Sequence, residues 1–233
     1  MKQGSWIDLT YPLNAATPVF PGQPGFNYQV HGTIDNPDIP LFYGGFSTME
    51  HCGTHMDAPA HAVASGLTVD QIPLTRLHGP AVIIDLAERC GDNADFDILG
   101  EHIEEFEGTH GRIEPGSIAL VRTGWGRFWT TDNGYVVVRD DGWHWPGMSG
   151  EAAELLMQRG VIGVGLDTVG LDGGHVAMTL AAHRAVLGAG AFILENLDNL
   201  EDLPARVEEL WALPIKVEGG SGGPTRVLAR VSS

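Results

Sequence analysis

The sequence has few cysteines and no long apolar run. Cys52 and Cys90 are the two cysteines among 233 residues, too few for a disulfide framework, which favours a reducing compartment. No charged and then apolar segment precedes a small-residue cleavage site near the start, and no apolar run is long enough to cross a bilayer. These absences predict a cytoplasmic protein.

The chain is also poor in positive charge. It has 13 Lys and Arg against 30 Asp and Glu, for a formal net charge of -17. Nucleic acid and anionic membranes bind basic surfaces, so both are unfavourable partners and a small molecule is favoured. A hydrophobic content of 43% is enough for one sizeable core, so we expect a single domain over residues 1–233.

What the chain does have is a short stretch dense in metal-binding residue types. Residues 51–61 read His-Cys-Gly-Thr-His-Met-Asp-Ala-Pro-Ala-His. On a helix, Asp57 would point away from His51 and His55, and Pro59 would break the helix. On a straight strand, His51 and His55 would lie roughly 13 Å apart, too far to share one ion comfortably. Neither regular element brings all of these side chains together.

A bend near Gly53 would solve this problem. It would bring His51 beside an extended His55-x-Asp57 pair, so that the three side chains reach one divalent ion, with His61 nearby as a free base. Nitrogen and oxygen ligands of this kind suit Zn²⁺, Mn²⁺ or Fe²⁺, and the lack of a cysteine pair argues against a closed structural zinc site. An open site that keeps a water predicts hydrolysis.

These residues carry a resemblance to a known family. The pattern His-x-Gly-Thr-His-x-Asp-x-Pro-x-His resembles the motif of the metal-dependent cyclase family, which includes bacterial kynurenine formamidase (arylformamidase) and isatin hydrolase. Further similar segments run through most of the chain: 6–10, 18–22, 145–149, 165–168, His183 and 195–197. In the family, the segment after residue 166 reads Asp-Thr-x-Ser-x-Asp, and here Gly170 replaces the serine.

The resemblance implies an activity and a site. It implies hydrolysis of the C–N bond of a small aromatic amide, such as N-formylkynurenine in tryptophan catabolism, by a water that a metal activates, with His61 as general base and acid. It implies one or two Zn²⁺ or Mn²⁺ ions per subunit, held by His51, His55, Asp57, His183 and Glu195, with Asp57 bridging. Glu195 favours the formamidase type over an isatin hydrolase that uses one metal. A homodimer or higher oligomer is also implied, with aromatic residues reaching across subunits.

The remaining sequence predicts the class of fold. Short apolar runs read as buried strands, and segments of helical spacing lie between them. The strands are expected at 81–86, 118–121, 161–166, 191–195, 213–217 and 225–231, and the helices at 97–107, 149–159 and 176–187. This mixture predicts an α/β or α+β fold with a mixed sheet and few helices. The resemblance adds a swivelling β/β/α fold with a barrel-like β core.

Two tracts rich in aromatic residues are candidates for substrate contact. Residues 6–46 read as an extended wrap with turns, and Phe42 is one of several aromatics in it. Residues 125–145 hold four tryptophans among glycines and charges, which reads as a partly mobile loop rather than core. We take Phe42, Trp125 and His144 as candidate substrate contacts; packing alone is the alternative.

Other functions were weighed against hydrolysis at a metal. Residues 219–223 match the G-x-S-x-G pattern of serine hydrolases, but too few residues follow for the helix, Asp and His that this motif requires. They read instead as a Gly-rich turn between two strands. Cys52 as a thiol nucleophile would point away from the ligands. A protein that binds a metal without turnover is the remaining alternative.

Overall fold

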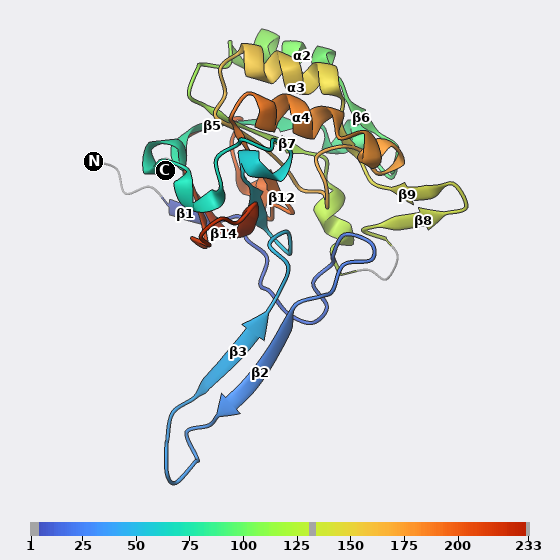
Figure 1. Cartoon of the computed structure of the whole chain (residues 1–233). Helices are drawn as coiled ribbons and strands as arrows, with labels where there is room; N and C mark the ends of the chain where they lie inside the picture. Colours follow the sequence, from blue (N-terminus) through green and yellow to red (C-terminus); the bar gives the residue numbers. More distant parts are fainter. Residues whose placement is uncertain (1–4, 131–133, 232–233) are drawn as a thin grey trace.

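A closed barrel of mixed strands forms the centre of the protein (Figure 1). The computed structural model describes residues 5–130 and 134–231. The barrel order is β14–β13–β5–β7–β11–β12–β4, and β14 closes it by pairing with β4 as well as with β13. The strands are β4 (His55–Asp57), β5 (His78–Asp85), β7 (Ile118–Arg122), β11 (Gly163–Leu166), β12 (Phe192–Glu195), β13 (Arg206–Pro214) and β14 (Gly222–Val231), with β1 (Ser5–Asp8) added beside β14.

The four central strands β5, β7, β11 and β12 are parallel and apolar on both faces. Successive side chains of a strand point to opposite faces. In β5, Val82 and Ile84 therefore pack into the core under the helices, while Ala81 and Ile83 pack into the barrel interior. Burial on both faces explains why these strands read as continuous apolar runs.

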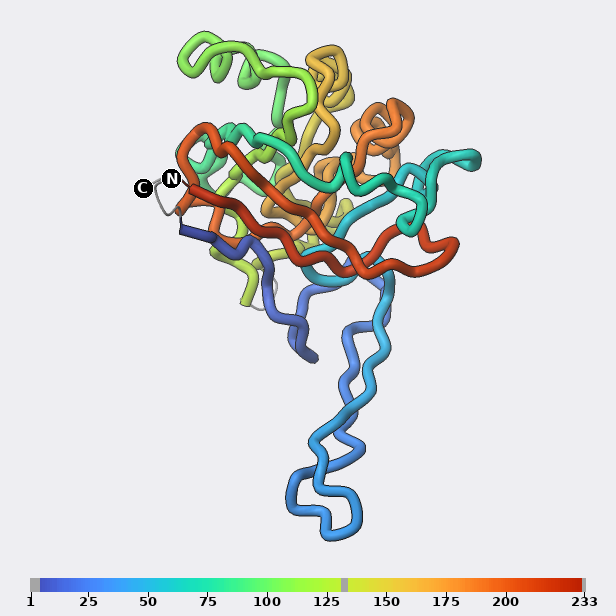
Figure 2. Tube along the Cα trace, turned by 90° about the vertical axis from the view of Figure 1, so that its left-hand side faces the viewer, coloured from blue at the N-terminus to red at the C-terminus, as the bar shows by residue number. Residues whose placement is uncertain are grey.

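The helices cover one outer face of the barrel (Figures 1 and 2). They are α1 (Ala87–Cys90), α2 (Gly100–His110), α3 (Gly150–Gln158) and α4 (Ala181–Gly188). Helix α3 follows the expectation closely, because Ser149 caps it by accepting the amide hydrogen bond of Ala152. Helix α2 begins three residues later than expected. Asp97 does not cap it, because residues 97–98 form strand β6 (Asp97–Ile98), paired with β10 (Gly147–Met148).

Short 3-10 helices connect several of these elements. The segment expected to be one helix from residue 176 is divided, since Leu180 has a φ of 52° between a 3-10 turn and α4. The 3-10 helices are η1 (Pro59–His61), η2 (Val69–Gln71), η3 (Leu74–Arg76), η4 (Trp125–Phe128), η5 (Gly174–Thr179) and η6 (Leu200–Asp202).

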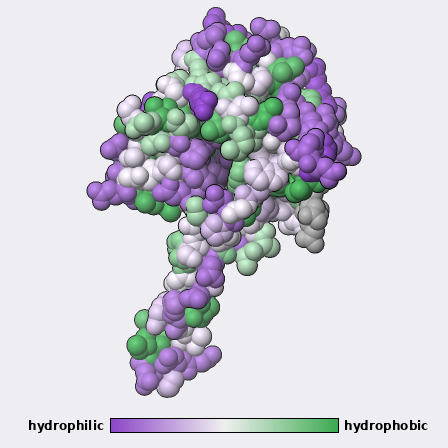
Figure 3. All heavy atoms as spheres, turned by 45° about the vertical axis from the view of Figure 1, so that its right-hand side comes forward, coloured by the Kyte–Doolittle hydropathy of each residue, from purple (hydrophilic) through white to green (hydrophobic). Residues whose placement is uncertain are grey.

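Two hairpins lie outside the barrel. Strands β8 (Val137–Arg139) and β9 (Gly142–His144) form a small one, and β2 (Asn27–Gly32) and β3 (Tyr43–Ser47) form a long arm. The arm, residues 27–47, projects away from the body in two perpendicular views (Figures 1 and 2). The sequence predicted an irregular wrap here, and the hairpin was missed. Its apolar side chains stand among polar ones on its surface (Figure 3).

The predicted class of fold, mixed α/β with a barrel-like β core and few helices, is confirmed. Within residues 5–130 and 134–231, none of the helices has both the length and the apolar character that crossing a membrane requires.

Candidate metal centre and active site

The metal-binding stretch bends where the sequence predicted. Gly53 has a φ of 64°, a left-handed conformation that glycine adopts without steric cost. The chain then enters β4, and His51 Nδ1 lies 2.6 Å from Asp57 Oδ1. The bend thereby brings His51, which precedes it, beside His55 and Asp57, which follow it.

Strand pairing brings the distant acidic residue to the same place. Strand β4 lies beside β12, with His55 opposite Glu195. His55 Nε2 is 3.3 Å from Asp57 Oδ1 and 3.4 Å from Glu195 Oε2. Helix α4 adds His183, whose Nε2 is 3.4 Å from Asp57 Oδ2 and 3.3 Å from Glu195 Oε1. The five predicted ligands therefore surround one small volume, with Asp57 near its centre.

The spacing of these atoms fits a metal ion. Ligands about 2.1 Å from a tetrahedral Zn²⁺ lie about 3.4 Å from each other, and the distances from His55 Nε2 to the two carboxylates match this. His55 Nε2 is also buried with no hydrogen-bond partner among the described residues. A buried polar atom without a partner is costly, and an ion between the carboxylates would satisfy it.

Each of three imidazoles is held through the nitrogen that faces away from the centre. His55 Nδ1 lies 2.8 Å from the carbonyl of Gly53. His183 Nδ1 lies 2.5 Å from Asp172 Oδ2, and His51 Nε2 lies 3.0 Å from Ser221 Oγ. An N–H on the outer nitrogen leaves the inner nitrogen with a free lone pair, as metal-binding histidines require.

The electrostatics of the centre favour a cation. Burial alone would raise the pKa of Asp57, but the positive charge of His51 and the close approach of the His183, His51 and His55 rings hold it well below its usual range. Burial alone would lower the pKa of His55, yet Asp57 and Glu195 raise it to about 9. Burial alone would also lower the pKa of His183, but Asp172, Asp57 and Glu195 raise it well above its usual value. The carboxylates thus stabilise positive charge between them.

His61 lies beside this group at the end of η1. Its ring centroid is 4.0 Å from that of His51 and 6.0 Å from that of His183. Desolvation lowers the pKa of His61, and the positive charges of His51 and His183 act in the same direction against the attraction of Asp57. Its side chain remains exposed on the cavity wall, which suits a group that exchanges protons with a substrate.

The ligands open into a cavity of about 270 Å³. A cavity of this size accommodates a small substrate. The wall opposite the ligands is mainly apolar, and Phe20 meets Trp145 edge to face with ring centroids 5.8 Å apart. The apolar lining consists of Pro18, Phe20, Met49, Trp145, Val169, Ala177, Met178 and Leu180.

Comparison with known proteins identifies the family. The Cyclase family model matches residues 7–173. The chain belongs to the Cyclase family. An isatin hydrolase of Roseibium aggregatum is 30% identical over 240 residues, which cover 97% of this chain and 91% of the relative. A kynurenine formamidase of Sphingopyxis alaskensis is 32% identical over 226 residues, which cover 96% of each protein.

Solved structures of isatin hydrolases are similar to this chain over almost its whole length. An isatin hydrolase bound to the product analogue thioisatinate has a TM-score of 0.92 and 29% identity, over 99% of this chain and 93% of that one. Isatin hydrolase A of Labrenzia aggregata, bound to benzyl benzoate, has a TM-score of 0.91 and 36% identity, over 99% and 94%. The prediction of a hydrolase of this family is confirmed.

The three candidate substrate contacts of this Cyclase-family chain lie away from the cavity. Trp125 is 2% exposed and its Nε1–H donates to the carbonyl of Tyr135. His144 is 3% exposed between Asp95 and Asp141. Phe42 is 61% exposed on the arm. None of the three lines the cavity in the described part of the chain, and Trp145 and Phe20 supply its aromatic wall instead.

Three of the four tryptophans of this tract belong to the core, contrary to the expectation of a loop rather than core; residues 131–133 of the tract lie outside the described residues. Trp125, Trp129 and Trp145 are buried, and Trp129 stacks on Tyr11 with ring centroids 4.0 Å apart. The N-terminal segment covers this tract, and that contact between distant segments leaves no local sign in the sequence.

The placement of His144 gives a prediction for stability. Its two ring nitrogens lie 2.6 Å from Asp95 Oδ1 and 3.0 Å from Asp141 Oδ1. The hydrogen bond to Asp95 raises the pKa of His144 above 6.5, against burial and Arg139. A raised folded pKa means that the imidazolium stabilises the fold at low pH and that this contribution is lost as pH rises through that pKa.

We therefore expect His144→Gln to lower the free energy of unfolding more at about pH 5.5 than at about pH 9. Urea unfolding at both pH values measures the difference, with exposed His110→Gln as the control. An equal loss at both pH values would contradict an ion pair at His144.

Several residues of the site escaped sequence reasoning. Asp172 accepts hydrogen bonds from the amides of Ala182 and His183 as well as from the His183 ring, so it fixes both the start of α4 and its histidine. Asn196 follows Glu195, has a φ of 57°, and donates from Nδ2 to the carbonyl of Gly53. A positive φ favours asparagine after glycine. The sequence did offer a signal for both residues, since Asp172 ends the segment that resembles Asp-Thr-x-Ser-x-Asp and Asn196 lies in the similar segment 195–197.

Proposed function

We propose that the protein hydrolyses the C–N bond of a small aromatic amide, with the N-formyl group of an aryl amine as the first candidate. The observation that carries this proposal is the convergence of His51, His55 and His183 on Asp57 and Glu195 at the end of a mainly apolar cavity. A Zn²⁺ or Mn²⁺ held by these five residues would lower the pKa of a water and polarise the amide carbonyl.

Other residues of the site transfer the proton, orient the ligands and bind the substrate ring. His61 accepts the proton of the attacking water and then donates it to the departing amine, so that formate and the free amine leave. Asp172, Ser221 and the Gly53 carbonyl keep the three ligand imidazoles oriented. The aromatic and aliphatic wall excludes bulk water and accepts the planar ring of the substrate.

A second candidate is a cyclic amide such as isatin, opened by the same attack. The likeness to two isatin hydrolase structures, with TM-scores of 0.92 and 0.91, favours it. Glu195 favours the formamidase type, since it supplies a second carboxylate close to His183.

The experiment is a hydrolysis assay on N-formylkynurenine, formanilide and isatin, each with and without a chelator. Metal content is measured on the purified protein. Turnover that the chelator abolishes and added Zn²⁺ or Mn²⁺ restores supports the enzyme, and the ratio of kcat/KM values decides between the two substrates. Bound metal without turnover of any substrate would favour a binding protein.

We also propose that the arm packs against a second copy of the chain. A two-stranded hairpin is marginal by itself in water, and a gathering of large exposed apolar side chains on one element indicates a protein interface. Exposed apolar side chains on the arm are Tyr28, Val30, Ile34, Ile39, Leu41, Phe42, Tyr43 and Phe46. Phe42 would contact substrate only by reaching the cavity of another subunit.

The arm gives a prediction for oligomeric state. We expect the wild-type chain to be a dimer or tetramer by light scattering, and Phe42→Ser with Phe46→Ser to weaken association by at least about tenfold, because both large side chains leave the interface. Gln29→Ser on the same hairpin is the control. A monomeric wild-type chain would contradict this role of the arm.

A further inference from the structure

The Gly-rich turn before β14 forms one wall of the metal centre. Gly222 pairs with Asp57 across β14 and β4, and the carbonyl of Ser221 accepts the amide hydrogen bond of Ala58 at 2.9 Å. A Cβ on Gly222 would lie 2.4 Å from the carbonyl oxygen of Met56 and 2.7 Å from Cε1 of His51. Only glycine lets the turn approach this closely, so the turn is shaped around the ligands.

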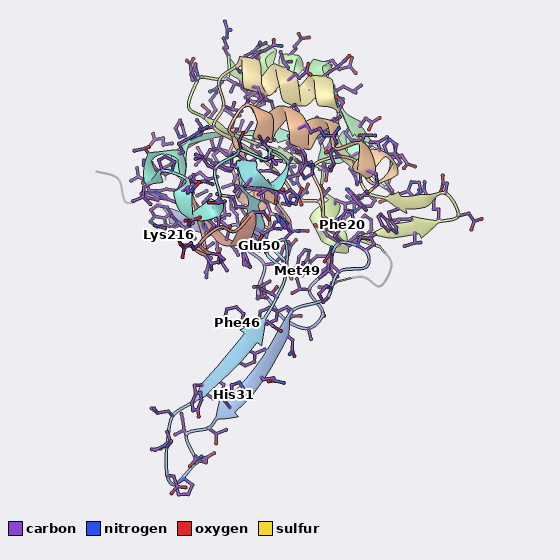
Figure 4. The ribbon with its side chains drawn as sticks, in the orientation of Figure 1. Phe20, His31, Phe46, Met49, Glu50 and Lys216 are labelled. Carbon is purple, nitrogen blue, oxygen red and sulfur yellow. The ribbon has the colours of Figure 1, made fainter. Side chains whose placement is uncertain are left out.

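Ser221 in this turn links His51 to an acidic residue. Its Oγ lies 3.0 Å from His51 Nε2 and 2.5 Å from Glu50 Oε2. The same carboxylate oxygen accepts the amide hydrogen bond of Ser221 at 2.9 Å. Glu50 lies with Met49 in the segment where the arm joins the body (Figure 4). The His51 imidazole, the serine hydroxyl and the carboxylate thus form a chain that leads outward from the centre.

The direction of these hydrogen bonds follows from the chemistry of their groups. A carboxylate only accepts, so the hydroxyl of Ser221 donates its one proton to Glu50. Its oxygen can then only accept from His51, and Nε2 must carry the proton. Nδ1 is left with a free lone pair facing the centre, 2.6 Å from Asp57 Oδ1. Without Glu50, the hydroxyl could donate to Nε2 and favour the wrong tautomer.

We propose that Ser221 and Glu50 are positioning residues that fix the tautomer and orientation of His51 for metal binding. This inference rests on the proposed metal-dependent function. The other two ligand imidazoles do not need such a pair, because the Gly53 carbonyl and the Asp172 carboxylate can only accept. His51 is also the most accessible of the three, with 23% of its side chain exposed against 3% for His55 and 9% for His183. Solvent that reaches this side chain can compete for its hydrogen bonds.

The test measures Zn²⁺ affinity on the metal-free full-length protein by competition with a chromophoric chelator. We expect Ser221→Ala to weaken binding by about 10- to 100-fold, the usual effect of removing the partner of a ligand histidine. Ser221→Thr keeps the hydroxyl and should restore affinity to within about threefold. Glu50→Ala should weaken binding by about tenfold. The matched controls are Ser65→Ala and Glu218→Ala, two exposed residues, which should bind as the wild type does.

A second readout separates positioning from nucleophilic catalysis. Ser221, His51 and Asp57 are linked in the order of a serine hydrolase triad, so the serine nucleophile is tested directly. A positioning role leaves kcat of Ser221→Ala within about threefold of wild type once Zn²⁺ is saturating, because serine touches no reacting atom. Collapse of kcat at saturating Zn²⁺ would overturn the proposal in favour of a nucleophile.

The remaining outcomes are equally decisive. Wild-type Zn²⁺ affinity in Ser221→Ala, or failure of Ser221→Thr to restore affinity in a folded protein, would overturn positioning. Thermal unfolding of the metal-free variants checks their folding, and Glu50→Ala decides the question if Ser221→Ala does not fold, since it leaves the turn sequence intact. A wild-type protein that binds no Zn²⁺ or Mn²⁺ would overturn the proposed function instead.

Discussion

Replacement of His61 by alanine should lower kcat by about 10²- to 10⁴-fold, the range expected for loss of a general acid and base. Metal content should stay unchanged. The reason is the position of His61 beside the ligands, on the cavity wall, with a pKa lowered below 6.5 by desolvation. Such an imidazole is neutral near pH 7 and free to accept a proton. Steady-state kinetics and metal analysis of the same preparation measure the two quantities.

A control variant at His110 and the metal content of His61→Ala decide whether His61 acts as the general base. His110 is exposed at the end of α2, away from the cavity, and His110→Ala should leave kcat unchanged. His61 also lies within ligand distance of His51 and Asp57. Loss of metal in His61→Ala would therefore make it a ligand and refute its assignment as the base.

Asp57→Asn should abolish metal binding and turnover together. The carboxylate of Asp57 is 1% exposed and faces the ring nitrogens of His51, His55 and His183. The amide has nearly the same shape but lacks the charge, so affinity should fall by more than the ~10- to 100-fold seen when a ligand merely loses its supporting partner. The Zn²⁺ titration used for Ser221→Ala measures this loss.

Asp57→Asn also predicts a change in stability. The substitution removes the negative charge that faces His55 and His183. An unpaired positive charge inside a protein lowers its stability. We expect lower thermal stability for the metal-free variant than for the exposed control Asp202→Asn. Full metal binding by Asp57→Asn would show that the centre lies elsewhere.

The sequence predicted those parts of the site that depend on neighbours along the chain. Residues 51–61 hold most of the candidate ligands, and their spacing excluded both regular elements, which led to the prediction of a bend at Gly53 that the structure has. Helix α3 was predicted well because its start and stop are local: Ser149 caps it, and Gly160 follows it with a φ of 78°. His183 and Glu195 were assigned by family resemblance, since their approach depends on how α4 packs against the barrel.

The sequence could not predict contacts between distant segments. The burial of Trp125 and Trp129 depends on Tyr11 and Tyr135. The link between His51 and Ser221 spans 170 positions, and the turn that holds Ser221 matched a serine-hydrolase pattern just as well. In the arm, residues 27–31 alternate polar and apolar side chains, but Gly44 and Gly45 interrupt this pattern in the partner strand, and both faces are exposed in the single chain.

Closure of the barrel by β14 has a consequence for how the protein folds. The strand that seals the barrel also walls the ligands, so contacts of very high sequence separation must form before the centre exists. High contact order slows folding, because loop-closure entropy is lost before these contacts compensate for it. A nascent chain that has not yet released residues 221–231 lacks the strand that closes the barrel beside Asp57, so we expect the proposed metal to bind at the last stage of maturation.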